Sequence, residues 1–114
     1  MAAGAALAFR QQGSDRVALN YIGDGGTSTG EFHEGLNMAA VLDVPLVLVI
    51  LNNRYAFSTP TREQYRAESL AARAAGYGIE GIQVDTSATC LKCNGLSRLM
   101  GIGGILHPKR IVPW

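Results

Sequence analysis

A glycine-rich turn with one acid, Gly23-Asp24-Gly25-Gly26, is followed 29 positions after its aspartate by a paired amide, Asn52-Asn53. Each comes directly after a strand-like run. Residues 17–22 are rich in β-branched and aromatic side chains and end at the glycines. Residues 46–51 are apolar on both faces, as in a strand buried inside a parallel sheet. The pattern therefore predicts two strands joined by one intervening element.

The intervening element is predicted to be a helix over about residues 30–42, because Phe32 and Leu36 recur at helical spacing. Ser28 and Glu31 form a capping-box pattern at its start. A strand–helix–strand return is right-handed in nearly all proteins, and its two strands run parallel. Parallel strands end at one edge of the sheet, where open α/β sheets bind ligands. Asp24 and Asn53 are therefore expected to lie together at that edge.

The rest of the chain continues the alternation of helices and strands. We expect a helix over residues 2–11, a second one from Arg62 or Glu63 to Ala75, and a short strand over residues 81–84. This order predicts an α/β fold with a doubly wound parallel sheet and helices on both faces. No element is predicted beyond Asp85. The side chains expected in the core are Tyr21, Tyr65, Leu70 and Ala74.

The composition bounds the class of protein and its partners. A chain of 114 residues forms at most one small domain. Ten basic against nine acidic residues argue against disorder and give no electrostatic reason to expect nucleic acid or an acidic membrane as a partner. The longest apolar run, residues 44–51, is too short to span a bilayer. The apolar N-terminal stretch has no basic region before it, so no secretory signal is expected and the default compartment is the cytoplasm.

The two cysteines, Cys90 and Cys93, are spaced as C-x-x-C. A zinc site needs four ligands, and the only further candidates, His33 and His107, are distant in the sequence. A thioredoxin-like redox motif begins a helix after a strand, which this segment does not resemble. We therefore expect neither a zinc site nor a redox site.

The chemistry expected at the shared sheet edge follows from the residue types. Magnesium takes oxygen ligands, commonly one or two from the protein and the rest from phosphates and water. Asp24 and Asn53 offer a carboxylate and an amide oxygen. Gly25 and Gly26 allow the backbone to approach a phosphate closely, and their N–H groups can donate to it. These residues indicate a magnesium–diphosphate site, and two ordinary turns are the alternative interpretation.

The same residues lie in longer motifs. Gly23-Asp24-Gly25, followed after an interval by Asn52-Asn53, resembles the thiamine diphosphate-binding motif of thiamine-dependent enzymes. The fuller series is similar to the alpha subunit of the decarboxylating first component of 2-oxo acid dehydrogenase complexes, over about residues 3–85. It comprises GEFHEGLNMAA (30–40), NNRY (52–55), STPT (58–61), Gln64, AARAAGYGI (71–79) and Val84-Asp85. STPT and AGYG look most like the branched-chain and the bacterial pyruvate or acetoin members.

This resemblance implies roles for individual residues. Asp24, the side chain of Asn53 and the backbone carbonyl of Tyr55 would ligate magnesium. Gly25 and Gly26 would contact the diphosphate through their N–H groups.

Three further polar residues receive other roles. Asn52 is interpreted as shaping its turn, and His33 and Glu34 as helix or subunit-contact residues. No catalytic residue is expected in this chain, because the family's beta subunit supplies the carboxylate that activates the aminopyrimidine.

The reaction implied by the family is the oxidative decarboxylation of a 2-oxo acid with transfer of the acyl group to a lipoyl group. Such an enzyme is an oxidoreductase that acts on an oxo group with a disulfide acceptor. The expected cofactors are thiamine diphosphate and magnesium. The expected partners are a beta subunit in a heterotetramer, the lipoyl acyltransferase component and a small 2-oxo acid substrate.

The sequence departs from the family beyond Asp85. Members continue with Gly and a stretch resembling Asn-Asp-Val-Leu-Glu-Val, whereas Thr86-Ser87-Ala88 follows in this chain. The codons of residues 88–93, read one nucleotide earlier, can spell Asp-Val-Leu-Glu-Val, so we hypothesise a shifted reading frame. The chain is therefore divided into a partial thiamine diphosphate-binding domain, residues 1–85, and a divergent tail, residues 86–114. Since upstream cofactor contacts of the family are also missing, we expect this fragment alone to be inactive.

Two alternatives stay open. Transketolase-like enzymes and 2-oxo acid decarboxylases share the Gly-Asp-Gly and Asn motif, although the run from Phe32 to Asn37 and Ser58-Thr59-Pro60 argue against them. A non-catalytic remnant is the other alternative.

Overall fold

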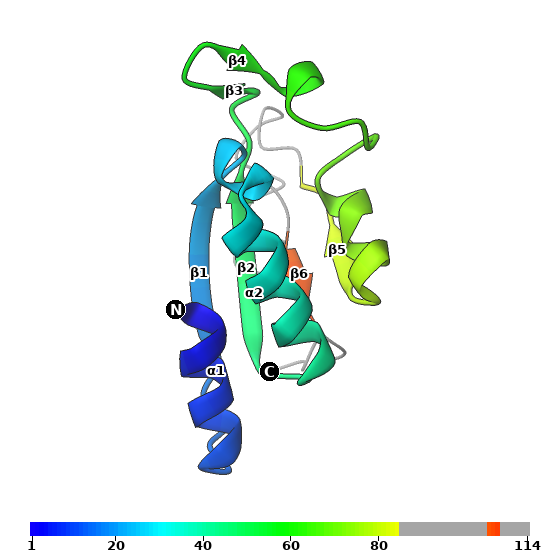
Figure 1. The fold of residues 1–114 in the computed structure, drawn as a ribbon. Coiled ribbons are helices and arrows are strands. Elements are labelled where there is room, and N and C mark those ends of the chain that lie inside the picture. The colour runs from blue at the N-terminus through cyan, green and yellow to red at the C-terminus, as the bar shows by residue number, and fades with distance from the viewer. Residues whose placement is uncertain (85–104, 108–114) are drawn as a thin grey trace, which may run out of the picture.

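The computed structural model describes residues 1–84 and 105–107 of the chain (Figure 1). Within these ranges it contains two α-helices, three 3-10 helices and six strands. In chain order they are α1 (Ala2–Gln11), β1 (Ala18–Gly23), η1 (Gly25–Ser28), α2 (Gly30–Val41), β2 (Leu46–Leu51), β3 (Tyr55–Ala56), β4 (Thr59–Pro60), η2 (Thr61–Glu63), η3 (Ala71–Tyr77), β5 (Glu80–Ile82) and β6 (Ile105–His107). No helix in the described ranges is long and apolar enough to cross a membrane.

The first two strands and the helix between them form the expected strand–helix–strand unit. β1 and β2 pair in parallel, in a register that runs from Ala18 opposite Leu46 to Gly23 opposite Leu51. Helix α2 lies beside both strands and returns the chain from the end of β1 to the start of β2 (Figure 1). The prediction of a parallel pair with a common carboxyl edge is therefore confirmed.

The described helices pack against one face of the sheet. Leu46, Leu48 and Ile50 alternate along β2, so their side chains share a face. Leu46 lies in a core cluster with residues of α1 and α2, while Leu48 and Ile50 lie in a second cluster with residues of α2 and η3. Burial of each such side chain stabilises the fold by about 1.5–3 kcal/mol. The α/β class is confirmed, with α1, α2 and η3 on this face.

The opposite face of β1 differs from the prediction. Tyr21 was expected in the core, but it is 52% exposed, and its neighbour Leu19 is also exposed. Both side chains point away from the face that α1 and α2 cover, because residues alternate along a strand. Within the described ranges β1 is also one of the two edge strands of the sheet, whose order is β1-β2-β6-β5. The prediction for Tyr21 was therefore wrong, since the sequence pattern does not tell which face receives a covering layer.

The start of α2 lies one residue from the predicted cap. Thr29, in an extended conformation, is the N-cap, and its Oγ1 accepts a hydrogen bond from the backbone N–H of Phe32 at 3.3 Å. Ser28 instead ends the preceding η1 turn. The Ser28–Glu31 capping box was therefore wrong. Thr29 takes the role because its hydroxyl also donates to the carbonyl of Gly26 at 2.9 Å, which joins η1 to α2.

The second predicted helix, from residue 62 or 63 to residue 75, is also wrong. The chain forms two short 3-10 helices, η2 and η3, separated by residues 64–70. Gln64 directs its side-chain amide to the carbonyl of Thr59 at 2.9 Å and to Asp24, and Ser69 Oγ accepts the N–H of Ala72 at 3.0 Å. These bonds to backbone and side-chain groups compete with helix propagation. Leu70 and Ala74 are buried in the second cluster and Tyr65 packs against it, as predicted.

The third strand lies one residue earlier than predicted, at Glu80–Ile82 instead of residues 81–84. It pairs antiparallel with β6, which also pairs antiparallel with β2. Parallel pairing is thus confined to β1 and β2 within the described ranges. The remaining residues of the predicted tail, and both cysteines, lie outside those ranges.

Gly81 permits the close packing of β5 against η3. A Cβ atom added to Gly81 would lie 2.2 Å from the carbonyl oxygen of Ala71 and 2.8 Å from the Cβ of Ala74. Both neighbours belong to the short helix, and one of them is backbone. A side chain at this position therefore requires η3 to move away from the sheet.

We expect Gly81→Ala to lower the free energy of unfolding by about 1–3 kcal/mol, because it overpacks this contact. Gly76→Ala is the matched control, since a Cβ at Gly76 meets no atom within 4 Å. Its free energy of unfolding should change by less than about 1 kcal/mol. Chemical denaturation of the two variants would show the difference, and equal stability would contradict the packing described.

Candidate functional site

Asp24 lies directly beyond the end of β1 and is buried, with 3% of its surface exposed. Its backbone N–H donates to the carbonyl of Leu51 at 3.1 Å, which continues the β1–β2 ladder by one step. Its carboxylate Oδ2 accepts a hydrogen bond from Gln64 Nε2 at 3.1 Å. Within residues 1–84 the carboxylate makes no ion pair. A buried carboxylate that receives a neutral amide is suited to bind a cation, because burial of an ionised group is otherwise costly.

The loop after β2 is shaped by its two asparagines. Asn52 Oδ1 accepts the N–H of Arg54, and Asn53 Oδ1 accepts the N–H of Tyr55, each at 2.9 Å. These successive Asx turns bend the chain back into the β3–β4 hairpin. Arg54 adopts a left-handed conformation with φ of 71°. Asn52 thus shapes the turn as expected, while the Asn53 oxygen retains a second lone pair for a ligand.

The glycine turn fits closely beneath this hairpin. A Cβ atom on Gly25 would lie 2.4 Å from the Cβ of Ala56, and one on Gly26 would lie 2.7 Å from two carbons of Ile22. A side chain at Gly25 would therefore push the hairpin away, whereas one at Gly26 would displace the side chain of Ile22. The N–H groups of Gly25 and Gly26 open the η1 turn, where no preceding carbonyl of that turn accepts them. These two N–H groups form a pair of donors beside Asp24, the glycine cradle.

The structure brings the predicted site residues to one edge of the sheet. Asp24 is joined to Leu51 at the end of β2, and Gly25 touches Ala56 of the hairpin that Asn53 and Tyr55 open. The hairpin lies beyond the carboxyl ends of β1 and β2 (Figure 1). His33 and Glu34 lie near the start of α2. His33 is half-buried and Glu34 is exposed.

Gln64 lies at this edge, although the sequence assigned it no role. Its Nε2 holds both Asp24 and the carbonyl of Thr59, so it ties the turn to the hairpin. Its Oε1 is buried and accepts no hydrogen bond within the described residues. A buried carbonyl oxygen of this kind is costly unless a donor reaches it. The sequence offered one signal, the presence of Gln64 among the motifs that carry the family resemblance.

These residues fit a magnesium–diphosphate group. The described residues contain no cluster of three His, Cys, Asp or Glu side chains, so a site for a metal that needs several such ligands is not formed by them. Magnesium instead combines one or two carboxylates with phosphates and water. Asp24 and Asn53 supply oxygens, the glycine cradle supplies donors for a phosphate, and water held by the ion can donate to Gln64 Oε1. The donor set therefore agrees with the group that the sequence pattern indicated.

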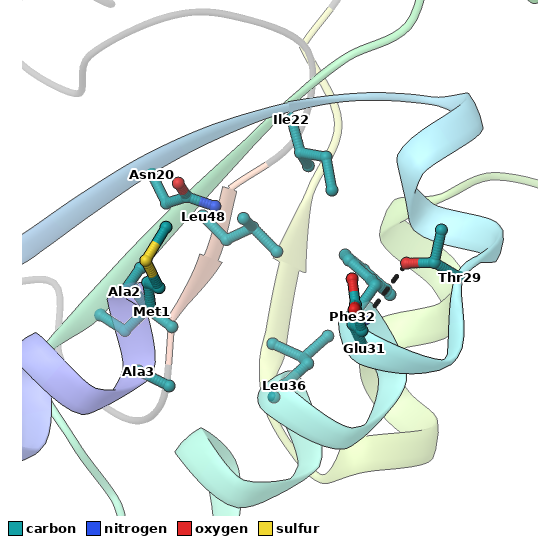
Figure 2. Close-up of a pocket in the computed structure, with 12 residues that line it drawn as sticks. Met1, Ala2, Ala3, Asn20, Ile22, Thr29, Glu31, Phe32, Leu36 and Leu48 are labelled. Carbon is teal, nitrogen blue, oxygen red and sulfur yellow. Dashed lines mark hydrogen bonds between the residues drawn. The ribbon is translucent and has the colours of Figure 1, made fainter.

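A separate hollow of about 630 Å³ lies between α1 and α2, on the helix-covered face of the sheet (Figure 2). Figure 2 shows Ala2 reaching it from α1, with Met1 just before that helix, Asn20 from β1, and Phe32 from α2. Its lining is largely apolar, and its charged side chain, Glu31, would repel an anion. The hollow is therefore unsuited to a diphosphate, and the Asp24 edge remains the candidate site.

Comparison with known proteins agrees with this geometry. Residues 1–90 match the family model described as "Dehydrogenase E1 component". The chain is 52% identical over 84 residues to the pyruvate dehydrogenase E1 component subunit alpha of Staphylococcus aureus, strain Mu50, covering 74% of this chain and 23% of the relative. It is 48% identical over 84 residues to the mouse mitochondrial 2-oxoisovalerate dehydrogenase subunit alpha, covering 74% of this chain and 19% of that protein.

A solved structure supports the same conclusion. It is described as a thiamin diphosphate-dependent enzyme from Mycobacterium smegmatis, and it is similar to this chain with a TM-score of 0.51 and 33% identity. The similarity covers 68% of this chain and 15% of that one. The chain spans about a quarter or less of the length of the curated relatives that it matches. With residues 1–90 matched and the thiamine diphosphate-binding fold confirmed, the chain belongs to the dehydrogenase E1 component family.

Proposed function

We propose that this chain forms one side of a magnesium–thiamine diphosphate site in the alpha subunit of a 2-oxo acid dehydrogenase. The observation that carries the proposal is the buried carboxylate of Asp24 beside the glycine cradle, under the hairpin opened by Asn53. The family match supports the type of cofactor, and the donor set supports the metal. The reaction proposed is oxidative decarboxylation of a 2-oxo acid, with the acyl group passing to a lipoyl group.

In this proposal the site residues of this chain bind the metal ion and the cofactor or orient the groups that do so. Asp24, Asn53 Oδ1 and the carbonyl of Tyr55 hold the magnesium ion, and the N–H groups of Gly25 and Gly26 hold the diphosphate. Gln64 holds the Asp24 carboxylate in position through its amide. Thiamine diphosphate, when bound, supplies the electron sink for decarboxylation. The protein supplies orientation and electrostatics around it.

The partners are proposals of the same kind. A beta subunit would complete the site and supply the carboxylate that the cofactor needs for activation, and a lipoyl acyltransferase would accept the acyl group. Relatives of both the pyruvate and the 2-oxoisovalerate type are similar to this chain at 52% and 48% identity. The proposal therefore names a 2-oxo acid as substrate class and leaves its side chain open.

Asp24→Asn is expected to weaken the binding of magnesium–thiamine diphosphate by about 100-fold or more, because removal of a buried charged partner costs about 2–5 kcal/mol. Asparagine keeps the shape of the side chain and can still accept from Gln64 Nε2. Isothermal titration calorimetry on the 114-residue chain would measure the affinity. Asp15→Asn, at an exposed position, makes the same change of charge and should leave the affinity unaltered. Equal losses in both variants would argue for nonspecific attraction and against the site.

Gln64→Ala is expected to weaken the same binding by about 10–100-fold, as for other residues that orient a metal ligand. The variant removes the donor to Asp24 and to Thr59 while leaving every proposed ligand in place. The control is Gln11→Ala at the exposed end of α1. Calorimetry that gave Gln64→Ala the wild-type affinity would remove Gln64 from the site.

The chain alone is expected to release no carbon dioxide from pyruvate or 2-oxoisovalerate in the presence of magnesium and thiamine diphosphate. The reason is that the carboxylate which activates the cofactor is assigned to the beta subunit. Carbon dioxide release would be followed with labelled substrate and compared with a sample that lacks protein. Turnover by the purified chain would contradict the assignment of the activating group to a partner.

A further inference from the structure

Arg73 reaches from η3 to the turn that carries Asp24. Its Nη1 donates to Thr27 Oγ1 at 3.2 Å, and its Nη2 donates to the carbonyl of Thr27 at 3.1 Å. Thr27 is fully buried and donates in turn to the carbonyl of Asp24, from its hydroxyl at 2.6 Å and from its N–H at 3.1 Å. The guanidinium of Arg73 therefore donates to both the side chain and the backbone of Thr27, whose own hydrogen bonds to Asp24 close the turn.

The imidazole of His33 also contacts the Arg73 guanidinium, and this contact requires one tautomer of the ring. Arg73 Nη2 lies 2.8 Å from His33 Nε2. An arginine can only donate, so a hydrogen bond to Nε2 requires the tautomer in which Nε2 presents its lone pair and Nδ1 carries the proton. Nδ1 is in contact with the hydroxyl of Tyr77, which accepts that proton's hydrogen bond. His33 thus bonds to the guanidinium through Nε2 and contacts Tyr77 through Nδ1.

The charge of Arg73 is not cancelled by a carboxylate within the described residues. Its hydrogen-bond partners there, Thr27 and His33, are neutral, and the guanidinium also lies over the ring of Phe32 at 5.7 Å from its centre. A cation in such surroundings raises the local potential more than one exposed to water, because screening is weaker. The two glycines of the cradle directly precede Thr27, so this potential acts where an anion would bind.

We propose that Arg73 is a positioning residue for the cofactor turn. Held by His33, which itself contacts Tyr77, Arg73 fixes Thr27 and thereby the glycine cradle, and its charge favours a diphosphate over an uncharged ligand. The second part rests on the proposed function, whereas the state of His33 and the fixing of the turn do not.

The protonation state of His33 provides the first test. Nitrogen-15 NMR of the imidazole rings separates the protonated, pyrrole-type nitrogen from the pyridine-type nitrogen that carries a lone pair. The chain has two histidines, so a His107→Asn variant leaves His33 as the source of the signals. We expect Nδ1 to be of the pyrrole type and Nε2 of the pyridine type. The opposite tautomer, or a doubly protonated ring at neutral pH, would overturn the arrangement.

The role of Arg73 is tested with Arg73→Met and Arg73→Lys, and with Arg66→Met as a control at an exposed position. We expect Arg73→Met to shift the amide resonances of residues 24–28 without any ligand and to weaken magnesium–thiamine diphosphate binding by about 10–100-fold. Arg73→Lys keeps the charge but loses the forked geometry, so it should restore part of the affinity. Arg66→Met should change neither quantity.

The outcomes separate this inference from the proposed function. If the wild-type chain does not bind magnesium–thiamine diphosphate, the proposed function and the charge effect fail, while unshifted resonances at residues 24–28 would refute the positioning role by themselves. Wild-type affinity in Arg73→Lys and Arg73→Met alike would overturn the part of the proposal that concerns the cofactor. If Arg73→Met does not fold, the lysine variant and the tautomer of His33 still decide the question.

Discussion

The parallel ladder between β1 and β2 determines where every candidate site residue lies. Its register brings Gly23 opposite Leu51, and the bond from the Asp24 N–H to the Leu51 carbonyl extends it by one step. Asp24 and the Asn52-Asn53 loop consequently leave the sheet side by side, although 29 positions separate Asp24 from Asn53. The crossover through α2 makes this arrangement possible, because parallel strands cannot be joined by a short turn.

A second set of contacts gives the edge its shape. Glycine at position 25 lets the turn pass close to Ala56 of the hairpin, and the Asx turns bend the hairpin back over it. Gln64 and Arg73 then reach the turn from segments 40 and 46 positions away in the chain. Their polar bonds are made in partly buried surroundings, where each is stronger than in water. The site is thus built by the sheet and held by side chains from later in the chain.

Sequence reasoning predicted the parts that follow from local patterns. The apolar strand at residues 46–51, the helix of residues 30–42 within one residue, and the family were all confirmed. It was wrong where distant contacts decide the local structure. Residues 64–70 do not continue a helix because Gln64 bonds to Asp24 and Thr59, and Tyr21 is exposed because of the face on which it lies. Neither the bonds of Gln64 nor the exposure of the Tyr21 face can be recognised from the spacing of apolar residues. The magnesium ligands remain a prediction.

The most direct test of the central claim, that this edge binds magnesium–thiamine diphosphate, is paramagnetic broadening of amide resonances by manganese in place of magnesium, with thiamine diphosphate present. Gly25, Gly26 and Asn53 should broaden first. Gly13 and Val44, at the other end of strands that extend roughly 20 Å, should be spared, and excess magnesium–thiamine diphosphate should reverse the effect. Equal broadening at both ends of the sheet, or broadening that excess magnesium–thiamine diphosphate does not reverse, would contradict the account.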